Sequence, residues 1–377
     1  MQEINIDLSE EKKLREELSK RTDAEARRME RFLSMPDLSR TLGSPLNEIV
    51  TRALKTKSLN GLDIIKIPEI VSTHILFDLF NMPPEHPARS KSDTYYVDDD
   101  HVLRTHDTVF WYYYLNHPDI KARIAKGEML GAVCHGKVYR KDEIDRKHMN
   151  VFHQIGAFYL APDDKKTITP QDLKDALSEI ARSIFGEKTE FRFYDHTFPY
   201  TDPSFEMEAN INGEWIEMVG CGMVRKSVLA EMGLTGYHGW AFGFGMERLA
   251  IASMKLPDIR LLWSDDPRVT KQLKLGQEFV EVSKYPPITR DISFVVPATF
   301  VPNDYFDLIR DIGGELVEQV SLLDKYENEE KFGADKMSYT YRTVYRSMER
   351  TLESKEVDTI HAKVESETKK QFGAEVR

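Results

Sequence analysis

Between Thr169 and Gly186, apolar residues recur at the spacing of a helix. They are Leu173, Leu177, Ile180 and Ile184. Thr169 suits the N-cap, Pro170 suits the first helical position, and Gly186 suits the end of a helix. The pattern therefore predicts an amphipathic helix over these residues.

The N-terminal part of the chain is more charged. A stretch from Ser9 to about Leu33 predicts a single, mostly solvated helix, with Ser9 as its N-cap and Pro36 as its end. Its thin apolar stripe consists of Leu14, Leu18, Met29 and Phe32. A second, short helix is predicted from Pro45 to about Leu54.

From about Gly61 to Gly245 the pattern changes to short strands rich in β-branched and aromatic residues. They are GLDIIKIPEIV, DTYYV, MLGAVCHGKVYR, VFHQIGAFYL, EFRFYD, FEMEANI and WIEMVGC. Many antiparallel strands with few helices indicate an α+β layer architecture. The chain has no dinucleotide-binding fingerprint and no P-loop, which disfavours a Rossmann-type fold.

The C-terminal part alternates in a different order. It predicts a strand (291–296), a helix (304–312), two strands (316–326 and 337–346) and a helix (355–366). This order is that of a ferredoxin-like βαββαβ unit. The expected organisation is an N-terminal helical extension (1–60), a main domain (61–266), a linker (267–282) and the ferredoxin-like domain (283–377).

Composition narrows the functional classes. The 377 residues are 41% hydrophobic and 31% charged, which is ordinary for a soluble protein. The net charge of −11 argues against a protein that coats nucleic acid, but it permits a local basic patch. Cys134 and Cys221 lack the paired spacing of a cysteine-based zinc site. No apolar run approaches the roughly 20 residues that span a bilayer, so no membrane partner is expected.

Two arginines stand at the ends of predicted elements. Arg140 ends an alternating strand, and a charged loop leads to a return strand that carries Phe152 and Gln154. About ninety residues later, Arg248 begins an apolar helix. Guanidinium groups bind phosphate oxygens in two places at once, and an aromatic ring can stack on a base. The arrangement indicates a site for a nucleoside triphosphate.

Seven segments, in order along the chain, resemble the single-chain, mitochondrial-type phenylalanyl-tRNA synthetases, which are class II aminoacyl-tRNA synthetases. They are HPARSKSDTYYV, LRTHDT, GKVYRKDEIDRKHMNVFHQ, TFPYTDPSFEMEANINGEWIEMVGCGMV, GWAFGFGMERLAI, PDIRLLW, and KYPPITRDISFVV with YRSMERTL. The resemblance implies a class II antiparallel sheet flanked by helices, followed by a ferredoxin-like anticodon-binding domain. It also implies a monomer that joins phenylalanine to tRNA(Phe), using ATP and Mg²⁺, through a phenylalanyl-adenylate.

The resemblance also assigns roles to individual residues of this chain. Arg140 and Arg248 are the expected catalytic residues. The expected ATP-binding residues are Arg140, Asp142, His148, Phe152 and Arg248. The expected amino-acid-binding residues are His106, Thr108, Gln154, Phe198, Tyr200, Cys221, Gly222 and Ala241. Glu217 is a candidate magnesium ligand.

In the terminal domain, Arg342, Arg346 and Arg350 are expected to bind tRNA, because basic side chains beside aromatic rings suit single-stranded RNA. Tyr339, Tyr341 and Tyr345 share the other face of the same strand. The alternative is an ordinary core face of tyrosines below a solvated face of arginines.

Two positions depart from the family pattern. Gly156 stands where the family has the glutamate that binds the ammonium of the amino acid. A buried ammonium needs a charged partner, so another carboxylate is expected to replace it. The candidates are Glu206, Glu208 and Glu217. Tyr200 stands where the family has phenylalanine, which leaves open how the site separates phenylalanine from tyrosine.

Two other functions compete with the ligase. One is a non-catalytic relative that senses tRNA or an amino acid, and Gly156 favours it. The intact Arg140, Phe152 and Arg248 oppose it. The other is an ATP-dependent ligase that does not use tRNA, which the terminal domain disfavours. Acidic residues near the N-terminus are unlike a transit peptide. The cytoplasm is therefore expected, with the mitochondrial matrix as the alternative.

Overall fold

The computed structural model describes residues 2–281 and 285–377, and these form two compact units. The first unit comprises Met1–Arg140, Val151–Leu256 and Leu273–Phe279. The second comprises Lys141–Asn150, Pro257–Gln272 and Val280–Arg377. The expected boundary between 282 and 283 lies outside the described residues, and the remaining domain limits stay predictions.

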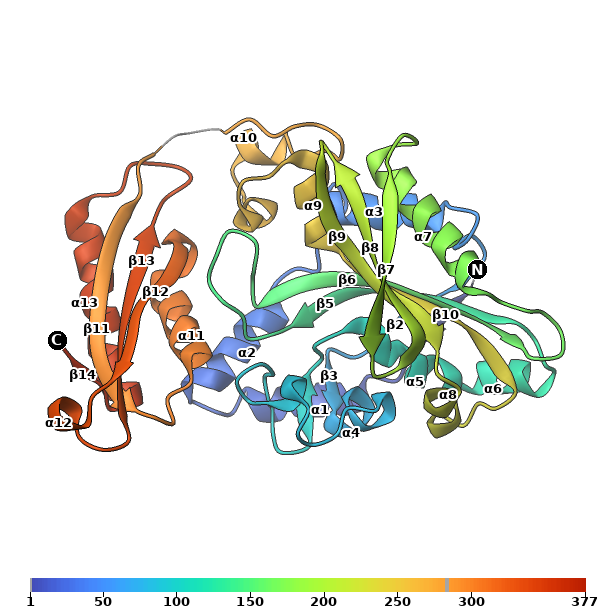
Figure 1. Ribbon diagram of the computed structural model, residues 1–377, viewed down its shortest axis with the longest axis horizontal. Helices are drawn as coiled ribbons and strands as arrows, with labels where there is room; N and C mark the ends of the chain where they lie inside the picture. Colours follow the sequence, from blue (N-terminus) through green and yellow to red (C-terminus); the bar gives the residue numbers. More distant parts are fainter. Residues whose placement is uncertain (1, 282–284) are drawn as a thin grey trace. The chain divides into compact units, whose positions relative to one another are not determined.

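An eight-stranded sheet forms the centre of the first unit (Figure 1). Its strands, in spatial order, are β1 (Glu3–Asn5), β2 (Asp63–Lys66), β5 (Leu130–Tyr139), β6 (Val151–Pro162), β10 (Tyr237–Gly245), β9 (Glu214–Val224), β8 (Thr201–Ile211) and β7 (Phe191–Phe198). The β1–β2 and β2–β5 pairs are parallel, and the pairs from β5 to β7 are antiparallel. This confirms the expected α+β class with a largely antiparallel sheet.

Helices cover both faces of this sheet. In Figure 1, α3 (Pro45–Leu54), α7 (Pro170–Phe185) and α9 (Met246–Met254) lie on one side, and α4 (Thr73–Leu76) and α5 (Phe110–Asn116) lie on the other. Helices α3 and α7 begin and end close to the predicted residues. In α7, Thr169 and Asp172 form a reciprocal capping box. The sheet is thus a layer between two groups of helices.

The single N-terminal helix expected from Ser9 to Leu33 is wrong. The structure has two helices there, α1 (Ser9–Leu18) and α2 (Ala24–Ser34). Asp23 starts α2, because its carboxylate accepts a hydrogen bond from the backbone N–H of Ala26. Ser9 is not the N-cap of α1, since its own N–H and hydroxyl bind the carboxylate of Asp7. Helix α2 is also less solvated than expected, because it buries Met29, Phe32 and other residues.

Sequence reasoning missed further helices in the region expected to be mainly strands. They are α4, α5, α6 (Pro118–Ala125) and α8 (Lys226–Glu231). Helix α5 is the sequence FWYYYLN, whose aromatic residues favour a strand. Tertiary packing overrides that preference, because the ring of Phe110 stacks on Phe158 of β6 with centroids 5.1 Å apart. The predicted strand DTYYV forms only an isolated bridge from Tyr96 to Val102.

Short elements complete the described regions. They are β3 (Ile70–Ser72), β4 (His101–Leu103), α10 (Pro267–Thr270), α12 (Glu329–Phe332) and the 3₁₀ turns Asp78–Phe80, Pro87–Arg89, Asp107–Val109, Ile259–Trp263 and Gly314–Leu316. In the described part of the chain, no helix combines the length and the apolar character that crossing a membrane requires.

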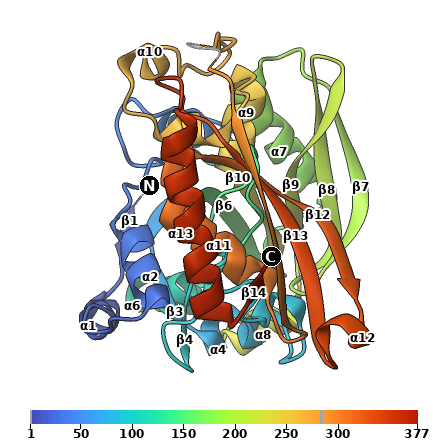
Figure 2. The same ribbon diagram turned by 90° about the vertical axis from the view of Figure 1, so that its left-hand side faces the viewer.

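The second unit contains a four-stranded sheet with the spatial order β12 (Val317–Glu327), β13 (Lys336–Tyr345), β11 (Ile288–Pro297) and β14 (Glu375–Val376). Helix α11 (Pro302–Gly313) follows β11, and α13 (Ser354–Phe372) precedes β14. The two helices pack against each other (Figure 2). This chain order confirms the expected ferredoxin-like βαββαβ unit.

Candidate active site

A row of glycines crosses the sheet of the first unit. Gly156 of β6 pairs with Gly243 of β10, and Gly243 pairs with Gly220 of β9. Directly paired residues point to the same face of a sheet, so three neighbouring strands carry no side chain at this place. The row continues to Glu206 of β8. Gly156, Gly243 and Gly220, called the glycine row below, leave room for other groups to lie directly on the backbone of the sheet.

Arg140 and Phe152 lie together at one end of this face. The guanidinium carbon of Arg140 is 5.2 Å from the centroid of the Phe152 ring, and Nε of Arg140 donates to the backbone oxygen of Thr105 at 2.9 Å. Phe152, Gln154 and Gly156 alternate along β6 and therefore share one face. The structure thus brings together the arginine, the aromatic ring and the amide that the sequence singled out.

Aromatic rings gather on the other side of the glycine row. The ring centroid of Tyr200 lies 5.8–6.1 Å from those of Phe80, Trp111 and Phe198, and these four residues are called the aromatic cluster below. A Cβ atom at Gly220 would lie 2.6 Å from Cζ of Phe198, so only glycine leaves space for this ring. Burial raises the pKa of Tyr200 to about 12, which keeps its hydroxyl neutral.

His106 lies beside the aromatic cluster. Its ring is stacked on Tyr200 with centroids 6.4 Å apart, and it meets Phe80 edge-to-face at 5.7 Å. Burial and the nearby charge of Arg140 lower the pKa of His106 to about 3. The imidazole is therefore neutral at physiological pH. Thr108 lies half-buried two residues further, in the 3₁₀ turn Asp107–Val109.

The aspartate between these two residues was not among the predicted site residues. Asp107 is 1% exposed, and its Oδ2 has no hydrogen-bond partner in the described parts of the chain. Burial raises the pKa of this carboxyl to about 7. A Cβ atom at Gly156 would lie 2.5 Å from Oδ2, and one at Gly243 would lie 3.4 Å from Oδ1. The carboxylate therefore rests on the glycine row.

The three glutamates expected to replace the missing one lie elsewhere. Each already has a cationic or imidazole partner: Glu206 lies 3.2 Å from His196, Glu208 2.5 Å from Arg192 and Glu217 2.6 Å from Arg248. Their strands, β8 and β9, are two or three positions from β6 in the sheet. At a strand spacing of about 4.8 Å, Glu206 is separated from Gly156 by roughly 14 Å. None of them lies beside Gly156.

Arg248 lies in the first turn of α9 and forms an ion pair with Glu217 of β9. Its Nη1 is 2.6 Å from Oε1 of Glu217, and both side chains are about half exposed, at 47% and 48%. Among the described residues, no group of three or more His, Cys, Asp and Glu side chains could hold a metal ion. A metal held by protein ligands alone does not fit here, and Glu217 as a magnesium ligand stays a prediction.

The other predicted residues of the amino-acid site divide between the two faces of the sheet. Gly222 of β9 pairs with Ala241 of β10, which pairs with Phe158, so these positions share the face of the glycine row. Cys221 points to the opposite face, and its pKa is raised by burial while Lys174 of α7 opposes the shift. Only the backbone of Cys221 can therefore line the site.

Behind the site, His153 joins three segments of the first unit. It follows Phe152 on β6 but points to the opposite face, where it is fully buried. Its Nδ1 lies 2.6 Å from Oε1 of Glu247 on α9, and its Nε2 accepts from the backbone N–H of Leu38 at 3.0 Å. Glu247, the neighbour of Arg248, is thus bound to the sheet.

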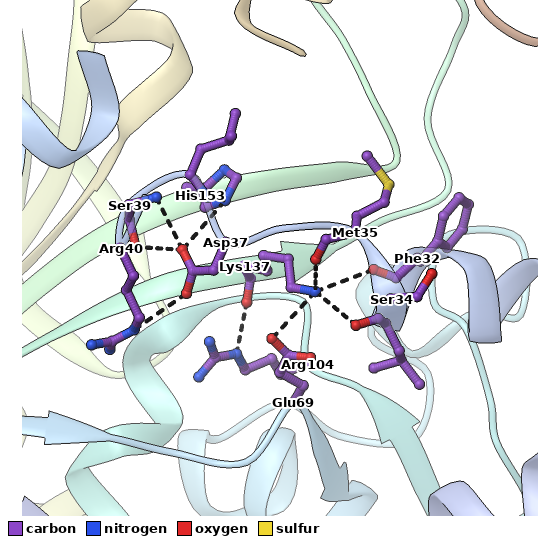
Figure 3. Close-up of polar contacts among 12 residues, drawn as sticks. Phe32, Ser34, Met35, Asp37, Ser39, Arg40, Glu69, Arg104, Lys137 and His153 are labelled. Atoms are coloured by element: carbon purple, nitrogen blue, oxygen red, sulfur yellow. Dashed lines mark hydrogen bonds and ion pairs between the residues drawn. The ribbon is translucent and has the colours of Figure 1, made fainter. Parts of the chain in front are cut away.

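Lys137, a buried lysine, also joins separate segments of the first unit. Nζ of Lys137, on β5, donates to the backbone oxygens of Phe32, Leu33 and Met35 at the end of α2 (Figure 3). A cation suits this place, because the last carbonyl groups of a helix have no partners within the helix. Figure 3 also shows Asp37 between His153 and Arg40. The N-terminal extension is therefore fixed to the central strands by buried polar contacts.

Asp142 and His148 belong to the segment Lys141–Asn150 of the second unit. Oδ1 of Asp142 accepts from the N–H of Glu143 at 2.8 Å, and Nδ1 of His148 lies 2.8 Å from Oδ2 of Asp145. Arg140 belongs to the first unit. The expected roles of Asp142 and His148 at ATP stay predictions.

The three arginines expected at tRNA are all engaged in ion pairs within the second unit. Arg342 pairs with Asp291, Arg346 with Glu318 and Arg350 with Glu356. The neighbouring tyrosines of β13 are buried in the core of this unit and cannot stack on bases; they are Tyr339, Tyr341 and Tyr345. The tyrosines therefore form a core face, as in the alternative, and tRNA binding by the three arginines stays a prediction.

Comparison with known proteins agrees with this architecture. The family model "tRNA synthetases class II core domain (F)" matches residues 33–273, and "Ferredoxin-fold anticodon binding domain" matches residues 283–377. A chloroplastic/mitochondrial phenylalanine–tRNA ligase of Arabidopsis thaliana is 39% identical over 319 residues, which cover 82% of this chain and 71% of the relative. The mitochondrial phenylalanine–tRNA ligase of Mus musculus is 36% identical, with 83% and 74% covered.

A mitochondrial relative from Saccharomyces cerevisiae, also a phenylalanine–tRNA ligase, is 31% identical, with 87% of each chain covered. The matches extend over both the sheet that carries the candidate site and the ferredoxin-like unit. The chain therefore belongs to the class II aminoacyl-tRNA synthetases, within the family of the single-chain phenylalanine–tRNA ligases.

Proposed function

We propose that this protein activates phenylalanine with ATP and transfers it to the 3′-terminal ribose of tRNA(Phe). The proposal is supported by the family and by one observation in particular. Phe152 and Gln154 lie on the same face of β6 as Gly156, Arg140 at the end of β5 packs against Phe152, and the aromatic cluster lies across the glycine row. That face offers a cation for phosphate, a ring for the base and apolar rings for a phenyl side chain.

The phenyl group of the substrate would lie against the aromatic cluster. Edge-to-face and offset-stacked contacts between rings contribute about 0.5–1.5 kcal/mol beyond burial. His106 is neutral and therefore adds no charge beside an apolar ligand. Ala241 of β10 has only a methyl side chain on this face and would meet the end of the ring, whereas the space above its paired residue Gly222 is taken by Thr201 and Pro203.

In the first step, a carboxylate oxygen of phenylalanine attacks the α-phosphorus of ATP, and pyrophosphate leaves. Arg140 would hold the α-phosphate and stabilise the negative charge that develops there. Arg248 would exchange its ion pair with Glu217 for the γ-phosphate. Magnesium bound to ATP would supply charge shielding for the triphosphate. The enzyme contributes positioning and electrostatics and forms no covalent intermediate.

In the second step, a hydroxyl of the terminal ribose attacks the carbonyl carbon of the adenylate, and AMP leaves. The ferredoxin-like unit would bind the anticodon region of the tRNA, as its family name implies. Arg342 is the arginine best placed for this task, because it is about half exposed. The relatives carry organellar names, which favours the mitochondrial alternative over the expected cytoplasm, and they are single chains, which favours a monomer.

Amino-acid-dependent exchange of pyrophosphate into ATP, measured with each of the twenty amino acids, tests the proposal. We expect exchange with phenylalanine. Exchange with tyrosine as well would place Tyr200 and Ala241 at the centre of specificity. A folded protein that exchanges with no amino acid would contradict the proposal and favour the non-catalytic alternative.

A further inference from the structure

The carboxylate of Asp107 occupies the space in which a side chain at position 156 would begin. A Cβ atom at Gly156 would lie 2.5, 2.9 and 3.0 Å from Oδ2, Cγ and Oδ1 of Asp107. Asp107 belongs to the 3₁₀ turn Asp107–Val109, which lies beside β5 and β6. The chain therefore has a carboxylate on the glycine row, but it comes from a different segment than the strand that carries Gly156.

Among the described residues, no cation pairs directly with this carboxylate. Asp107 is 1% exposed, Oδ2 makes no hydrogen bond, and no arginine or lysine forms a salt bridge with it in the described parts of the chain. Arg104 and Arg140 act on it only from a longer distance. A buried carboxylate without a partner is costly, so such a group indicates a position where a ligand supplies the opposite charge.

The neighbours of Asp107 show which part of an amino acid would meet it. The backbone N–H of Asp107 donates to Oε1 of Gln154 at 2.9 Å, which fixes the turn against β6. The carboxylate lies over Gly156, while Arg140 packs on Phe152, four positions earlier on β6, and Trp111 of the aromatic cluster packs on Phe158, two positions later. The carboxylate thus stands between the group that would hold phosphate and the rings that would hold the side chain. In an α-amino acid, the carboxylate, the ammonium and the side chain are attached to the same carbon, so a substrate with its carboxylate toward Arg140 and its ring in the aromatic cluster has its ammonium in the region of Asp107.

We infer that Asp107 binds the α-ammonium group of the amino-acid substrate, in place of a carboxylate at position 156. This inference rests on the proposed function and deepens it. It also explains why position 156 is glycine, since any side chain there would collide with Asp107. The raised pKa of Asp107 agrees with a buried carboxyl whose opposite charge is supplied by the ligand.

Binding of two ligands can distinguish ammonium recognition by Asp107 from a purely structural role of this residue. Phenylalanine and 3-phenylpropionate have the same ring and carboxylate, but only phenylalanine has the ammonium. Their dissociation constants are measured by calorimetry for the full-length wild type and for Asp107→Asn. The matched control is Glu206→Gln, which removes the carboxylate at the far end of the same row.

We expect Asp107→Asn to weaken phenylalanine binding by at least about 30-fold and to leave 3-phenylpropionate binding nearly unchanged, because truncating a buried charge pair costs 2–5 kcal/mol. Glu206→Gln should change neither. An equal loss for both ligands would overturn the inference in favour of a structural role, and an effect confined to Glu206→Gln would assign the ammonium to Glu206. If the wild type binds neither ligand and exchanges no pyrophosphate, the proposed function itself fails. An active wild type with unaffected Asp107→Asn rejects only this inference.

Discussion

His153 of β6 and Glu247 of α9 form a buried pair in which Nδ1 lies 2.6 Å from Oε1. Oε2 of the same carboxylate accepts from the backbone N–H of His153 at 2.8 Å. The sequence neighbours of the pair are Phe152, Gln154 and Arg248, which are three of the predicted site residues. The pair therefore fixes, from behind the sheet, the two elements that present these residues.

Removing this carboxylate should destabilise the first unit. Glu247→Ala leaves the ring N–H and the backbone N–H of His153 buried without partners, so we expect the free energy of unfolding to fall by about 3 kcal/mol. Urea denaturation followed by circular dichroism measures the change. Glu278→Ala is the matched control, because Glu278 pairs with Lys255 but is 64% exposed. It should change stability by less than about 0.5 kcal/mol. Equal losses in the two variants would contradict the structural importance of the pair.

Arg248 should be essential for activation but dispensable for folding. Its guanidinium is about half exposed and has Glu217 as its partner, so Arg248→Ala should not lower the unfolding temperature. The rate of pyrophosphate exchange should fall by roughly 100- to 1000-fold, as for other preorganised charges at a reacting phosphate or oxyanion. Arg192→Ala is the control, since Arg192 also pairs with a glutamate of the sheet, Glu208. Similar activities of the two variants would contradict the assignment.

A glutamate introduced at position 156 should be tolerated only when Asp107 is shortened. In Gly156→Glu alone, the new Cβ meets the buried carboxylate at 2.5 Å, and two carboxylates share one buried place. We expect a loss of roughly 3 kcal/mol in unfolding free energy from overpacking and repulsion. In a protein that already carries Asp107→Ser, the same Gly156→Glu change should lower the unfolding free energy much less than it does in the wild type. Denaturation curves of the four proteins give the coupling, and strictly additive effects would show that the two positions do not interact.

The pH dependence of amino-acid binding follows from the pKa of Asp107. Burial raises this pKa to about 7 in the folded protein, and only the ionised form attracts an ammonium. The Michaelis constant for phenylalanine should therefore increase about tenfold per pH unit below 7. His106 cannot cause this increase, because its pKa is about 3. The increase should be absent in Asp107→Asn, and its persistence there would assign it to another group.

The same pKa has a consequence for stability. The folded pKa of Asp107 lies above its ordinary value of 3.8, so the folded state binds the proton more tightly than the unfolded state. The resulting stabilisation is complete below about pH 4 and is lost as the pH rises through about 7. Asp107→Asn removes this contribution. Its free energy of unfolding, relative to wild type, should therefore be more favourable at pH 7.5 than at pH 5, as measured by urea denaturation. A difference that does not change with pH would contradict the shift.

The sequence predicted those features that depend on local pattern and missed those that depend on pairing between distant strands. Phe152 and Gln154 could be placed on one face, because alternation along a strand is a local property. That Gly156, Gly243 and Gly220 form a row depends on the register of three strands. Asp107 belongs to LRTHDT, one of the segments that resemble the family, but its position over Gly156 depends on a tertiary contact.

Arg342 and Arg346 share a face of β13 but should differ in function. Arg342 is 47% exposed and pairs with the exposed Asp291, so it can exchange this partner for a phosphate. Arg342→Ala should raise the Michaelis constant for tRNA about fivefold, the effect of roughly 1 kcal/mol, without changing pyrophosphate exchange. Arg346 instead pairs with Glu318, which is only 3% exposed. Arg346→Ala should therefore lower the stability of the second unit by about 1–3 kcal/mol, because it weakens the compensation of a buried charge. Aminoacylation kinetics at several tRNA concentrations, together with thermal unfolding, separate the two roles. Loss of stability in Arg342→Ala would contradict its role at tRNA. Loss of tRNA affinity alone in Arg346→Ala would contradict its structural role.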